Sequence, residues 1–287
     1  MAGRLSIILS GVPGRMAQKI AAVCEDERAQ AGADHARIVH ALARPGSSVL
    51  GEPLSKAPGF PSSCRCVPTA EITDDHARAL ADSGELEHGV WIDFSAPAAA
   101  PAHAERAAEL GVPFLTGTTG LGAEETTRIE AVADRIPVLI AANTSLGINL
   151  LSRLVRDVAR SLGPAYDIEI VEAHHKWKKD APSGTALLLG RRAAEGRGQS
   201  LDEVARHGRE GRDALREPGE IGFHALRMGD VVGEHRVYFV GNGERIELAH
   251  AAHDRRTFAA GAVAAARFLR AQKPGLYTMT DVLAGGG

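Results

Sequence analysis

The segment from Glu172 to Thr185 gathers residue types that suit acid–base chemistry on an anion. It contains the adjacent pair His174 and His175, and Lys178 follows four positions after the first histidine. A histidine can deliver a proton near neutral pH, and a lysine ammonium can hold an anion. A lone histidine more often has a structural role, but two histidines with a nearby lysine favour a site.

The residues that follow predict an anion pocket at the start of a helix. Ser183, Gly184 and Thr185 come after Pro182 and open a predicted helix at Gly184–Ala194. The first N–H groups of a helix lack intrahelical partners, and glycine lets a ligand approach the backbone closely. Together with the two hydroxyls they indicate a carboxylate-bearing substrate. The plainer alternative is helix capping by Ser183 beside a solvated basic loop.

A predicted strand, Asp167–Ala173, leads into the histidine pair. Successive side chains on a strand point to opposite faces. His174 and His175 therefore face one site only if the strand ends there; otherwise they have different roles.

A glycine-containing turn near the start of the chain is a candidate dinucleotide site. Gly11-Val12-Pro13-Gly14-Arg15-Met16 follows an apolar stretch, Leu5–Ser10, and opens a predicted helix. In that context the free N–H groups and the helix dipole attract a pyrophosphate. Pro13 and Met16 stand where the second and third glycines of G-x-G-x-x-G would be, so an ordinary β–α turn remains the alternative.

The next predicted strand, Arg37–Leu42, bears on the choice of cofactor. It is followed by Ala43 and Arg44, with no acidic residue. Sites selective for NAD usually carry Asp or Glu there, whereas an arginine accommodates the 2′-phosphate of NADP. Arg44, helped by Arg15, therefore predicts NADPH rather than NADH, unless Arg44 is only a solvated surface charge.

Short apolar stretches alternate with helical patterns through the first half of the chain. The predicted strands are Leu5–Ser10, Arg37–Leu42, Gly89–Phe94, Pro113–Thr116 and Pro137–Ala141, and the predicted helices are Met16–Gln30, Pro97–Leu110 and Glu124–Arg135. This alternation predicts an α/β fold with a Rossmann-like, doubly wound parallel sheet. Small or hydroxyl-bearing residues follow several strands, at the end where such sheets bind ligands.

The second half predicts a second α+β domain with an open mixed sheet. After a helix at Gly147–Leu162, the stretch from Gly222 to Ala251 predicts strands broken at 228–230 and at Gly241-Asn242-Gly243, where Asn-Gly favours a hairpin. The polar segment 196–219 predicts an exposed helix and a mobile loop. The alanine-rich helix Thr257–Arg270 returns to the first domain. The expected domains are thus residues 1–143 with 255–287, and residues 144–254.

The composition of the chain argues against several classes of protein and of site. The 287 residues carry a net charge of −3, which gives no reason to expect a nucleic-acid partner. No apolar run approaches the length of a membrane span, so a cytoplasmic protein without a membrane partner is expected. The odd number of cysteines argues against a disulfide framework. Cys64-Arg65-Cys66 lacks the second pair of a structural zinc site, so no metal is expected and the two thiols lie in a loop.

The segment that begins at Glu172 resembles the signature of the 4-hydroxy-tetrahydrodipicolinate reductases, E-x-H-H-x-x-K-x-D-A-P-S-G-T-A. Every fixed position is met, through Ala186. The resemblance extends over nearly the whole chain. Further matching stretches are Gly11 to Met16, Asp93-Phe94-Ser95, Gly117-Thr118-Thr119-Gly120, Ala142 to Asn149, Arg227 to His235, Arg255 to Ala262 and Met279 to Leu283.

The resemblance implies an NAD(P)H-dependent reduction of a small cyclic imine dicarboxylate in lysine and diaminopimelate biosynthesis. The nicotinamide would supply a hydride to ring C4, the substrate hydroxyl would leave as water, and His174 would donate the proton. Lys178 would assist catalysis and hold the substrate, with His175, Ser183, Gly184 and Thr185 as further substrate contacts. The implied cofactor contacts are Gly11-Val12-Pro13-Gly14-Arg15-Met16, Arg44, Gly117-Thr118-Thr119 and Ala141-Ala142-Asn143-Thr144.

The family also implies a homotetramer assembled through the sheet of the second domain. The chain departs from the family at Pro13 and Ala17 in the phosphate loop, at Ala43, and at Thr144, where an aromatic residue is frequent near the nicotinamide. These departures bear on cofactor preference rather than on the reaction.

Two other hypotheses remain open at this point. The chain could be another two-domain Rossmann reductase, such as an amino-acid dehydrogenase, although the cluster from His174 to Thr185 suits a dicarboxylate better. It could also be a nucleotide-binding or redox-sensing protein that kept the fold without the chemistry. The presence of both His174 and Lys178 argues against that second hypothesis.

Overall fold

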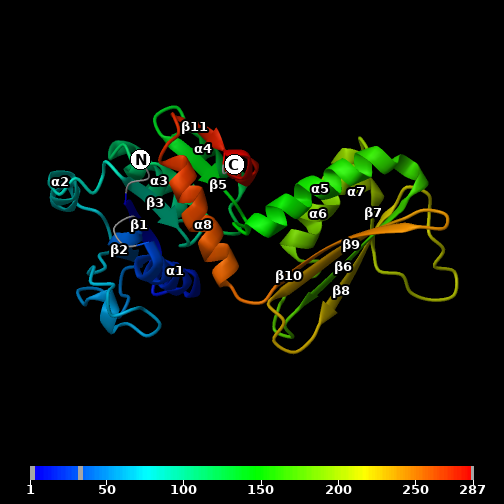
Figure 1. Cartoon of the computed structure of the whole chain (residues 1–287), viewed down its shortest axis with the longest axis horizontal. Coiled ribbons are helices and arrows are strands. Elements are labelled where there is room, and N and C mark those ends of the chain that lie inside the picture. Colours follow the sequence, from blue (N-terminus) through cyan, green and yellow to red (C-terminus); the bar gives the residue numbers. More distant parts are fainter. Residues whose placement is uncertain (1–3, 32–34, 286–287) are drawn as a thin grey trace. The chain divides into compact units, whose positions relative to one another are not determined.

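The computed structural model describes residues 4–31 and 35–285, and the chain divides into two compact units. The first unit combines two separate stretches, Met1–Ser145 and Arg256–Gly287, and the second is the stretch between them, Leu146–Arg255 (Figure 1). None of the helices within the described ranges has the length and apolar character needed to cross a bilayer.

A parallel sheet forms the centre of the first unit. Its strand order is β11-β5-β4-β3-β1-β2, and every neighbouring pair is parallel. The strands are β1 (Leu5–Val12), β2 (Ala36–Ala43), β3 (Gly89–Asp93), β4 (Phe114–Thr116), β5 (Pro137–Ile140) and β11 (Gly275–Tyr277). The central strands are buried along nearly their whole length, as expected when both faces of a sheet are covered.

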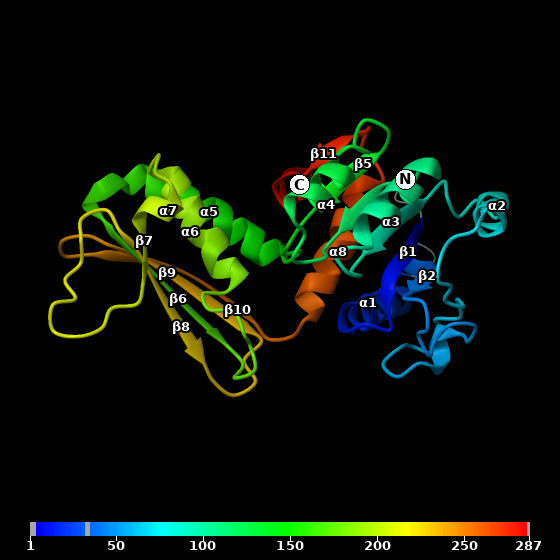
Figure 2. The ribbon, with the colours of Figure 1, turned by 180° about the vertical axis from the view of Figure 1, so that it is seen from behind.

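Helices cover both faces of this sheet, which confirms the predicted Rossmann-like, doubly wound fold. Helix α1 (Arg15–Ala31) packs against α8 (Arg256–Leu269), while α3 (Ala100–Glu109) packs against α4 (Ala123–Glu130) on the opposite face (Figures 1 and 2). The described part of the unit also contains α2 (Asp74–Asp82), α9 (Met279–Gly285) and a 3-10 turn at Leu54–Lys56. Trp91 and Phe114 lie in the core beneath α3.

The second unit contains a mixed sheet, as predicted. Its order is β10-β9-β6-β8-β7, with β9 antiparallel to both neighbours and β8 parallel to both of its own. The strands are β6 (Asp167–His174), β7 (Ala205–His207), β8 (Ile221–Arg227), β9 (Gly233–Val240) and β10 (Arg245–Ala252). The predicted hairpin joins β9 to β10, and Gly243 in its turn has a φ of +90°, which glycine adopts readily.

Helices cover one face of the mixed sheet. They are α5 (Leu146–Leu162), α6 (Gly184–Gly196) and the short α7 (Leu201–Val204), with a 3-10 turn at Gly163–Ala165. Figures 1 and 2 show α5 and α6 side by side on that face. The core between helices and sheet includes Ile168, Ile170, Phe223 and Phe239. Apolar side chains such as Leu226 remain exposed on the other face.

In residues 196–219 the expected helix is only the single turn α7, and a strand that the sequence pattern does not predict follows it. Helix α6 already ends at Gly196, α7 is a single turn, and Ala205–His207 forms a strand that pairs with β8. The reason is tertiary: Leu201 is drawn into the core, and the chain after it extends the edge of the sheet. Two further elements, β11 and α2, are not predicted by the sequence pattern.

Candidate active site

His174 is the last residue of β6, and the strand ends between the two histidines. Glu172 and His174 lie on the same face of the strand and are both buried, at 1% and 8% exposure. The chain then turns, with the Lys178 amide donating to the carbonyl of His175 at 3.1 Å. Because the strand ends, the face alternation no longer applies to His175, which lies half-buried in the turn.

Glu172 is the centre of a buried hydrogen-bond network. Its carboxylate accepts from both terminal nitrogens of Arg227 at 2.9 Å, from Nδ1 of His174, and from the Ser183 amide at 3.1 Å. Burial by itself raises the pKa of Glu172, but the hydrogen bonds from Arg227 and His174 outweigh it, and the pKa is lowered. Glu172 is therefore ionised, and its oxygens only accept hydrogen bonds.

That carboxylate determines the tautomer of His174. Since an ionised carboxylate cannot donate, Nδ1 of His174 carries the hydrogen, and Nε2 is the nitrogen left for other chemistry. A Cβ on Gly233 would lie only 3.1 Å from Nε2, so glycine keeps space there. Burial lowers the pKa of His174, helped by the Lys178 and Arg227 cations and opposed by Glu172. A lowered pKa makes the protonated ring a stronger acid.

His235 is a second buried histidine of this cluster. Its ring meets that of His174 edge-on, with 5.2 Å between centroids, and its Nε2 lies 3.1 Å from the Ser183 hydroxyl. Burial lowers its pKa to about 3, so the ring is neutral at physiological pH. Sequence reasoning assigned no role to His235 or Arg227, although both lie in the stretch Arg227 to His235 that carries the family resemblance.

The start of α6 adjoins this network. Ser183 caps the helix, with its hydroxyl accepting from the Ala186 amide at 3.2 Å, and Glu172 holds the Ser183 amide. A Cβ on Gly184 would meet nothing within 4 Å, so the backbone there faces open space. Ser183 is thus buried and caps the helix, as the alternative of simple helix capping predicts. The backbone at Gly184 remains open to a ligand.

The predicted substrate contact Thr185 lies in the first turn of α6, whereas His175 and Lys178 lie on the loop between β6 and α6. Lys178 donates to Asp180 at 2.8 Å. Among the described residues Lys178 makes no hydrogen bond to His174, yet its charge lowers the pKa of that ring. The ring of His175 lies 5.8 Å from that of Trp177, and its Nδ1 has no hydrogen-bond partner among the described residues. The structure therefore joins His174 and Ser183 directly through Glu172, whereas Lys178 is linked to His174 only electrostatically.

In the first unit, a tight turn joins the end of β1 to α1, with the Gly14 amide donating to the Gly11 carbonyl at 2.8 Å. Gly11 has a φ of +96°, and a Cβ there would lie 2.1 Å from the carbonyl oxygen of Phe94, so only glycine fits. A Cβ on Gly14 would lie 2.6 Å from the Gly11 carbonyl oxygen. Helix α1 begins at Arg15, at the carboxyl end of β1, and its first N–H groups suit a pyrophosphate. These residues fit the cofactor despite Pro13.

Asp93, at the end of β3, is fully buried and fixes the loops that follow β3 and β4. Its carboxylate accepts hydrogen bonds from His103 at 2.8 Å, Ser95 at 2.7 Å, Thr116 at 3.0 Å and Thr118 at 2.7 Å. Burial raises the pKa of Asp93, but these donors, led by His103, outweigh it and lower the pKa. Asp93 lies in one of the stretches that resemble the family, but the sequence analysis predicts no role for it.

The remaining predicted cofactor contacts lie at the carboxyl ends of the parallel strands. A Cβ on Gly117 would overlap the Phe94 ring, and Thr119 beyond it is exposed. After β5, Ala142 is exposed, but Thr144 is buried and its hydroxyl donates to the carbonyl of Phe258 at 2.7 Å. Arg44 is exposed directly after β2. Within the described ranges, no group of three His, Cys, Asp or Glu side chains could hold a metal.

Known proteins of one family are similar to this chain over nearly its whole length. Family models described as "Dihydrodipicolinate reductase, N-terminus" and "Dihydrodipicolinate reductase, C-terminus" match residues 5–144 and 147–283. The chain is 44% identical to the 4-hydroxy-tetrahydrodipicolinate reductase of Rubrobacter xylanophilus over 281 residues, covering 97% of this chain and 98% of the relative. It is also 44% identical to the reductase of that name from Beijerinckia indica, covering 99% and 98%.

Among solved structures, the dipicolinate-bound dihydrodipicolinate reductase from Paenisporosarcina sp. TG-14 has the same fold. It superposes with a TM-score of 0.70 at 22% identity, covering 96% of this chain and 97% of that one. With both family models and full-length relatives in agreement, this chain belongs to the dihydrodipicolinate reductase family.

Proposed function

We propose that the chain is a 4-hydroxy-tetrahydrodipicolinate reductase that uses NAD(P)H, in the cytoplasm, for a step of lysine and diaminopimelate biosynthesis. The observation that carries the proposal is the buried network in which Glu172 holds both Nδ1 of His174 and the amide that opens α6. One carboxylate thereby positions a proton donor next to a helix start suited to an anion.

The second unit supplies the substrate site in this proposal, and the first supplies the cofactor site. We assign cofactor binding to residues 1–143 and 255–287 and substrate binding to residues 144–254. The division of the chain after Ser145 and after Arg255 supports these boundaries. Full-length relatives that carry the reductase name support the same arrangement.

The substrate would be a small cyclic dicarboxylate. Gly184 and Thr185 would receive one carboxylate at the start of α6, where Ser183 shapes the turn, and His175 and Lys178 would contact the same molecule from the preceding loop. The family neighbour from Paenisporosarcina sp. TG-14 is described as bound to dipicolinate, a compound of that class.

The cofactor would lie along the carboxyl ends of the parallel strands. Gly11 to Met16 would hold the pyrophosphate, with Gly117 to Thr119 and Ala141 to Thr144 on neighbouring turns. When bound, the nicotinamide supplies the hydride. We favour NADPH over NADH, because Arg44 and Arg15 are both exposed near the turn after β1 and no acid follows β2.

His174 would donate its proton from Nε2, the nitrogen that faces Gly233. Glu172 would hold the ring through Nδ1 in both protonation states, and it would stabilise the imidazolium before the transfer. Lys178 would stabilise negative charge on the substrate ring. Positioning of the reactants is expected to supply most of the rate enhancement, with the proton transfer contributing about 10²–10⁴-fold.

An absorbance assay tests this proposal. The substrate is generated in the cuvette by the preceding synthase, and oxidation of NADPH or NADH is followed at the nicotinamide band. We expect turnover that requires both the synthase and this protein. Turnover with amino acids and oxidised cofactor instead would indicate an amino-acid dehydrogenase, and cofactor binding without turnover of either kind would indicate a nucleotide-binding protein.

We further propose that the protein is a homotetramer assembled through the uncovered face of the mixed sheet. This face carries Leu226, which is 47% exposed, beside a groove of about 460 Å³ that Val171, Ala173 and Met228 also line. The Leu226→Glu variant should dissociate in light-scattering chromatography. Leu215→Glu, at a more exposed leucine on the 208–220 loop, should leave the assembly intact. A monomeric wild-type protein would contradict the proposal.

A further inference from the structure

A pocket of about 580 Å³ in the first unit lies away from the proposed cofactor loop. It is lined by the start of β2 at Ala36–Val39, by the second half of α1, and by the loop residues Ser63 to Cys66. The cofactor loop and Arg44 lie at the carboxyl ends of β1 and β2, whereas this pocket lies at their amino ends, where Arg4 precedes β1. None of the residues that line this pocket has a role in the proposed reductase reaction.

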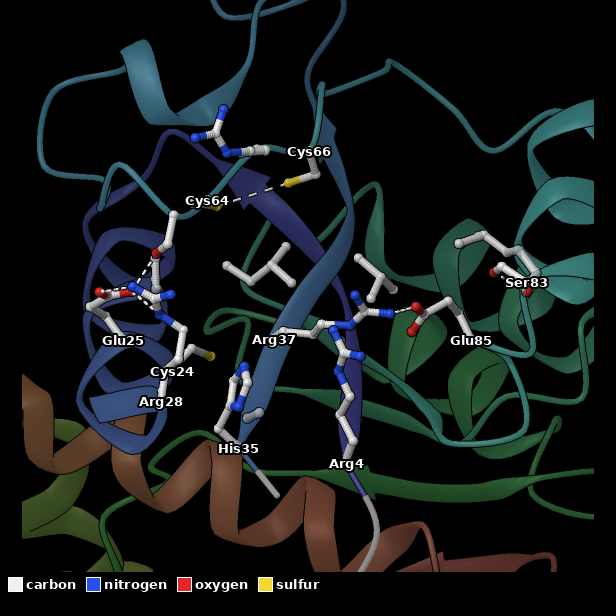
Figure 3. A pocket seen from close by; sticks show the side chains of 17 residues that line it. Arg4, Cys24, Glu25, Arg28, His35, Arg37, Cys64, Cys66, Ser83 and Glu85 are labelled. Carbon is white, nitrogen blue, oxygen red and sulfur yellow. Dashed lines mark hydrogen bonds and ion pairs between the residues drawn. The ribbon is translucent and has the colours of Figure 1, made fainter. Parts of the chain in front are cut away.

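All three cysteines of the chain line this pocket (Figure 3). The sulfur atoms of Cys64 and Cys66 are 3.9 Å apart, in contact through a weak S–H···S hydrogen bond. Both residues are only partly buried, so small molecules in the pocket can reach them. Cys24 differs because it is buried in α1, and burial raises its pKa to about 12.

The surroundings favour a thiolate at one of the two loop cysteines. The hydrogen bond from Cys66 lowers the pKa of Cys64, while the same contact raises the pKa of Cys66. The lining of the pocket also carries more cationic than anionic side chains, and Arg28 pairs there with Glu25 and Arg37 with Glu85. The cations are Arg4, Arg28, Arg37 and Arg65, and the anions are Glu25 and Glu85.

We infer that Cys64 and Cys66 form a peroxide-sensitive dithiol, a modification site at which hydrogen peroxide converts the two thiols into a disulfide. The Cys64 thiol loses its proton and the thiolate attacks one peroxide oxygen; the O–O bond breaks, the leaving hydroxide takes up that proton as water, and Cys64 becomes a sulfenic acid. The Cys66 sulfur then displaces the sulfenic oxygen as water and forms the S–S bond. Both sulfurs are oxidised, and one peroxide is reduced to two molecules of water.

The geometry selects Cys66 as the resolving thiol. Closing the bond requires the two sulfurs to approach from 3.9 Å to about 2.05 Å, a movement that side-chain rotation in a surface loop can supply. Cys24 is a poorer candidate because its thiol is buried in a helix and its raised pKa disfavours the nucleophilic thiolate.

Peptide mapping tests this inference without reference to enzymatic activity. The folded protein is treated with hydrogen peroxide, remaining thiols are blocked with N-ethylmaleimide in denaturant, and the protein is digested with trypsin. Cleavage after Arg65 separates the two cysteines, so a Cys64–Cys66 disulfide is detected as peptide 57–65 joined to peptide 66–78. We expect this linked pair, with two of the three thiols lost and Cys24 still blocked by the reagent.

Serine variants provide the controls. Cys24→Ser should form the linked pair at the wild-type rate, whereas Cys64→Ser and Cys66→Ser should each abolish it. Linkage of peptide 57–65 to the Cys24 peptide 20–28 would overturn the assignment. So would recovery of all three thiols after peroxide, or a sulfinic acid at Cys64 with Cys66 still free.

Discussion

The carboxylate of Glu172 accepts a hydrogen bond from Nδ1 of His174, and both side chains are buried in the second unit. Arg227 binds the same carboxylate through two nitrogens at 2.9 Å. The carboxylate thus lies between the imidazole and the guanidinium, and the anion favours the protonated form of His174 whereas the cation disfavours it. Substitutions of these two neighbours should shift the pKa of His174 in opposite directions.

The opposite effects of Glu172 and Arg227 on the pKa of His174 predict how the reaction depends on pH. If His174 must be protonated, kcat/KM falls as pH rises through its pKa, which burial holds below the ordinary 6.5 in the free protein. Glu172→Gln removes the stabilising anion and should move the descending limb to lower pH. Arg227→Gln removes the opposing cation and should move it to higher pH. Steady-state assays across the pH range measure both limbs, and a shift in the same direction for both variants would exclude this role of His174.

Removal of the proton donor should affect turnover rather than cofactor binding. His174→Ala is expected to lower kcat by about 10²–10⁴-fold, the usual contribution of general acid catalysis. The Kd for NADPH, measured by fluorescence titration, should stay close to the wild-type value, because the proposed cofactor residues all lie in the first unit. His253→Ala, at an exposed histidine of the second unit, serves as the control. Wild-type turnover by His174→Ala would remove this residue from the mechanism.

Asp93 should matter for stability and for cofactor affinity together. Asp93→Asn cannot accept from His103, Ser95, Thr116 and Thr118 at once, so the loops after β3 and β4 lose their common anchor. Hydrogen bonds to a buried charge contribute about 1.5–3 kcal/mol each, and we expect a loss of ~3 kcal/mol in the free energy of unfolding. The KM for the cofactor should rise more than kcat falls.

Denaturant unfolding and steady-state kinetics measure the two effects. Asp74→Asn is the matched control, since Asp74 lies in the same unit and its ion pair with Arg106 is on the surface. A variant with wild-type stability but impaired kinetics would show that Asp93 does not anchor these loops.

Arg44 should decide between the two nicotinamide cofactors. Its guanidinium is exposed after β2, and a charge-assisted pair with the 2′-phosphate would be lost in Arg44→Ala. We expect the KM for NADPH to rise about 10- to 100-fold, corresponding to roughly 1.5–3 kcal/mol, with little change for NADH. Arg78→Ala, at an exposed arginine of α2, should change neither value. Equal effects on both cofactors would contradict recognition of the phosphate by Arg44.

His235 should make the fold less stable in acid. Its folded pKa is about 3, against 6.5 for an ordinary histidine. Between these values the unfolded chain binds a proton that the folded chain does not, so the free energy of unfolding falls as pH falls, by up to ~1.4 kcal/mol per pH unit. His235→Gln should lose this contribution and show a shallower decline in urea unfolding. His253→Gln should keep the wild-type slope, and equal slopes for all three proteins would refute the buried neutral state.

The sequence pattern predicts the elements that carry a continuous apolar signal. Strands β1 to β5 lie where short apolar stretches predict them, since both faces of each strand are buried. Strand β11 (Gly275–Tyr277) is as short as β4, but β4 is buried at every residue, whereas Leu276 in β11 is exposed and no apolar stretch marks the strand. It forms because β5 offers it a parallel neighbour, and such pairing is a property of the assembled sheet.

The same limit applies to the candidate site. His174, Lys178 and Ser183 fall in one short segment, so spacing and resemblance identify them together. Arg227 and His235 come from β8 and β9, and strand register brings them to the network: Arg227 pairs with His174 across β6 and β8, and His235 pairs with Glu172 across β6 and β9. A one-residue slip would turn these side chains to the other face, and the sequence alone does not determine that register.

Helix α8 and strand β11 follow the entire second unit in the chain, although both belong to the first. During synthesis the ribosome therefore delivers α1 and β5 long before the elements that cover them. Until residue 277 has emerged, β5 retains an unpaired edge of the kind that recruits strands from other chains. The growing chain must keep that edge protected while the second unit is being made.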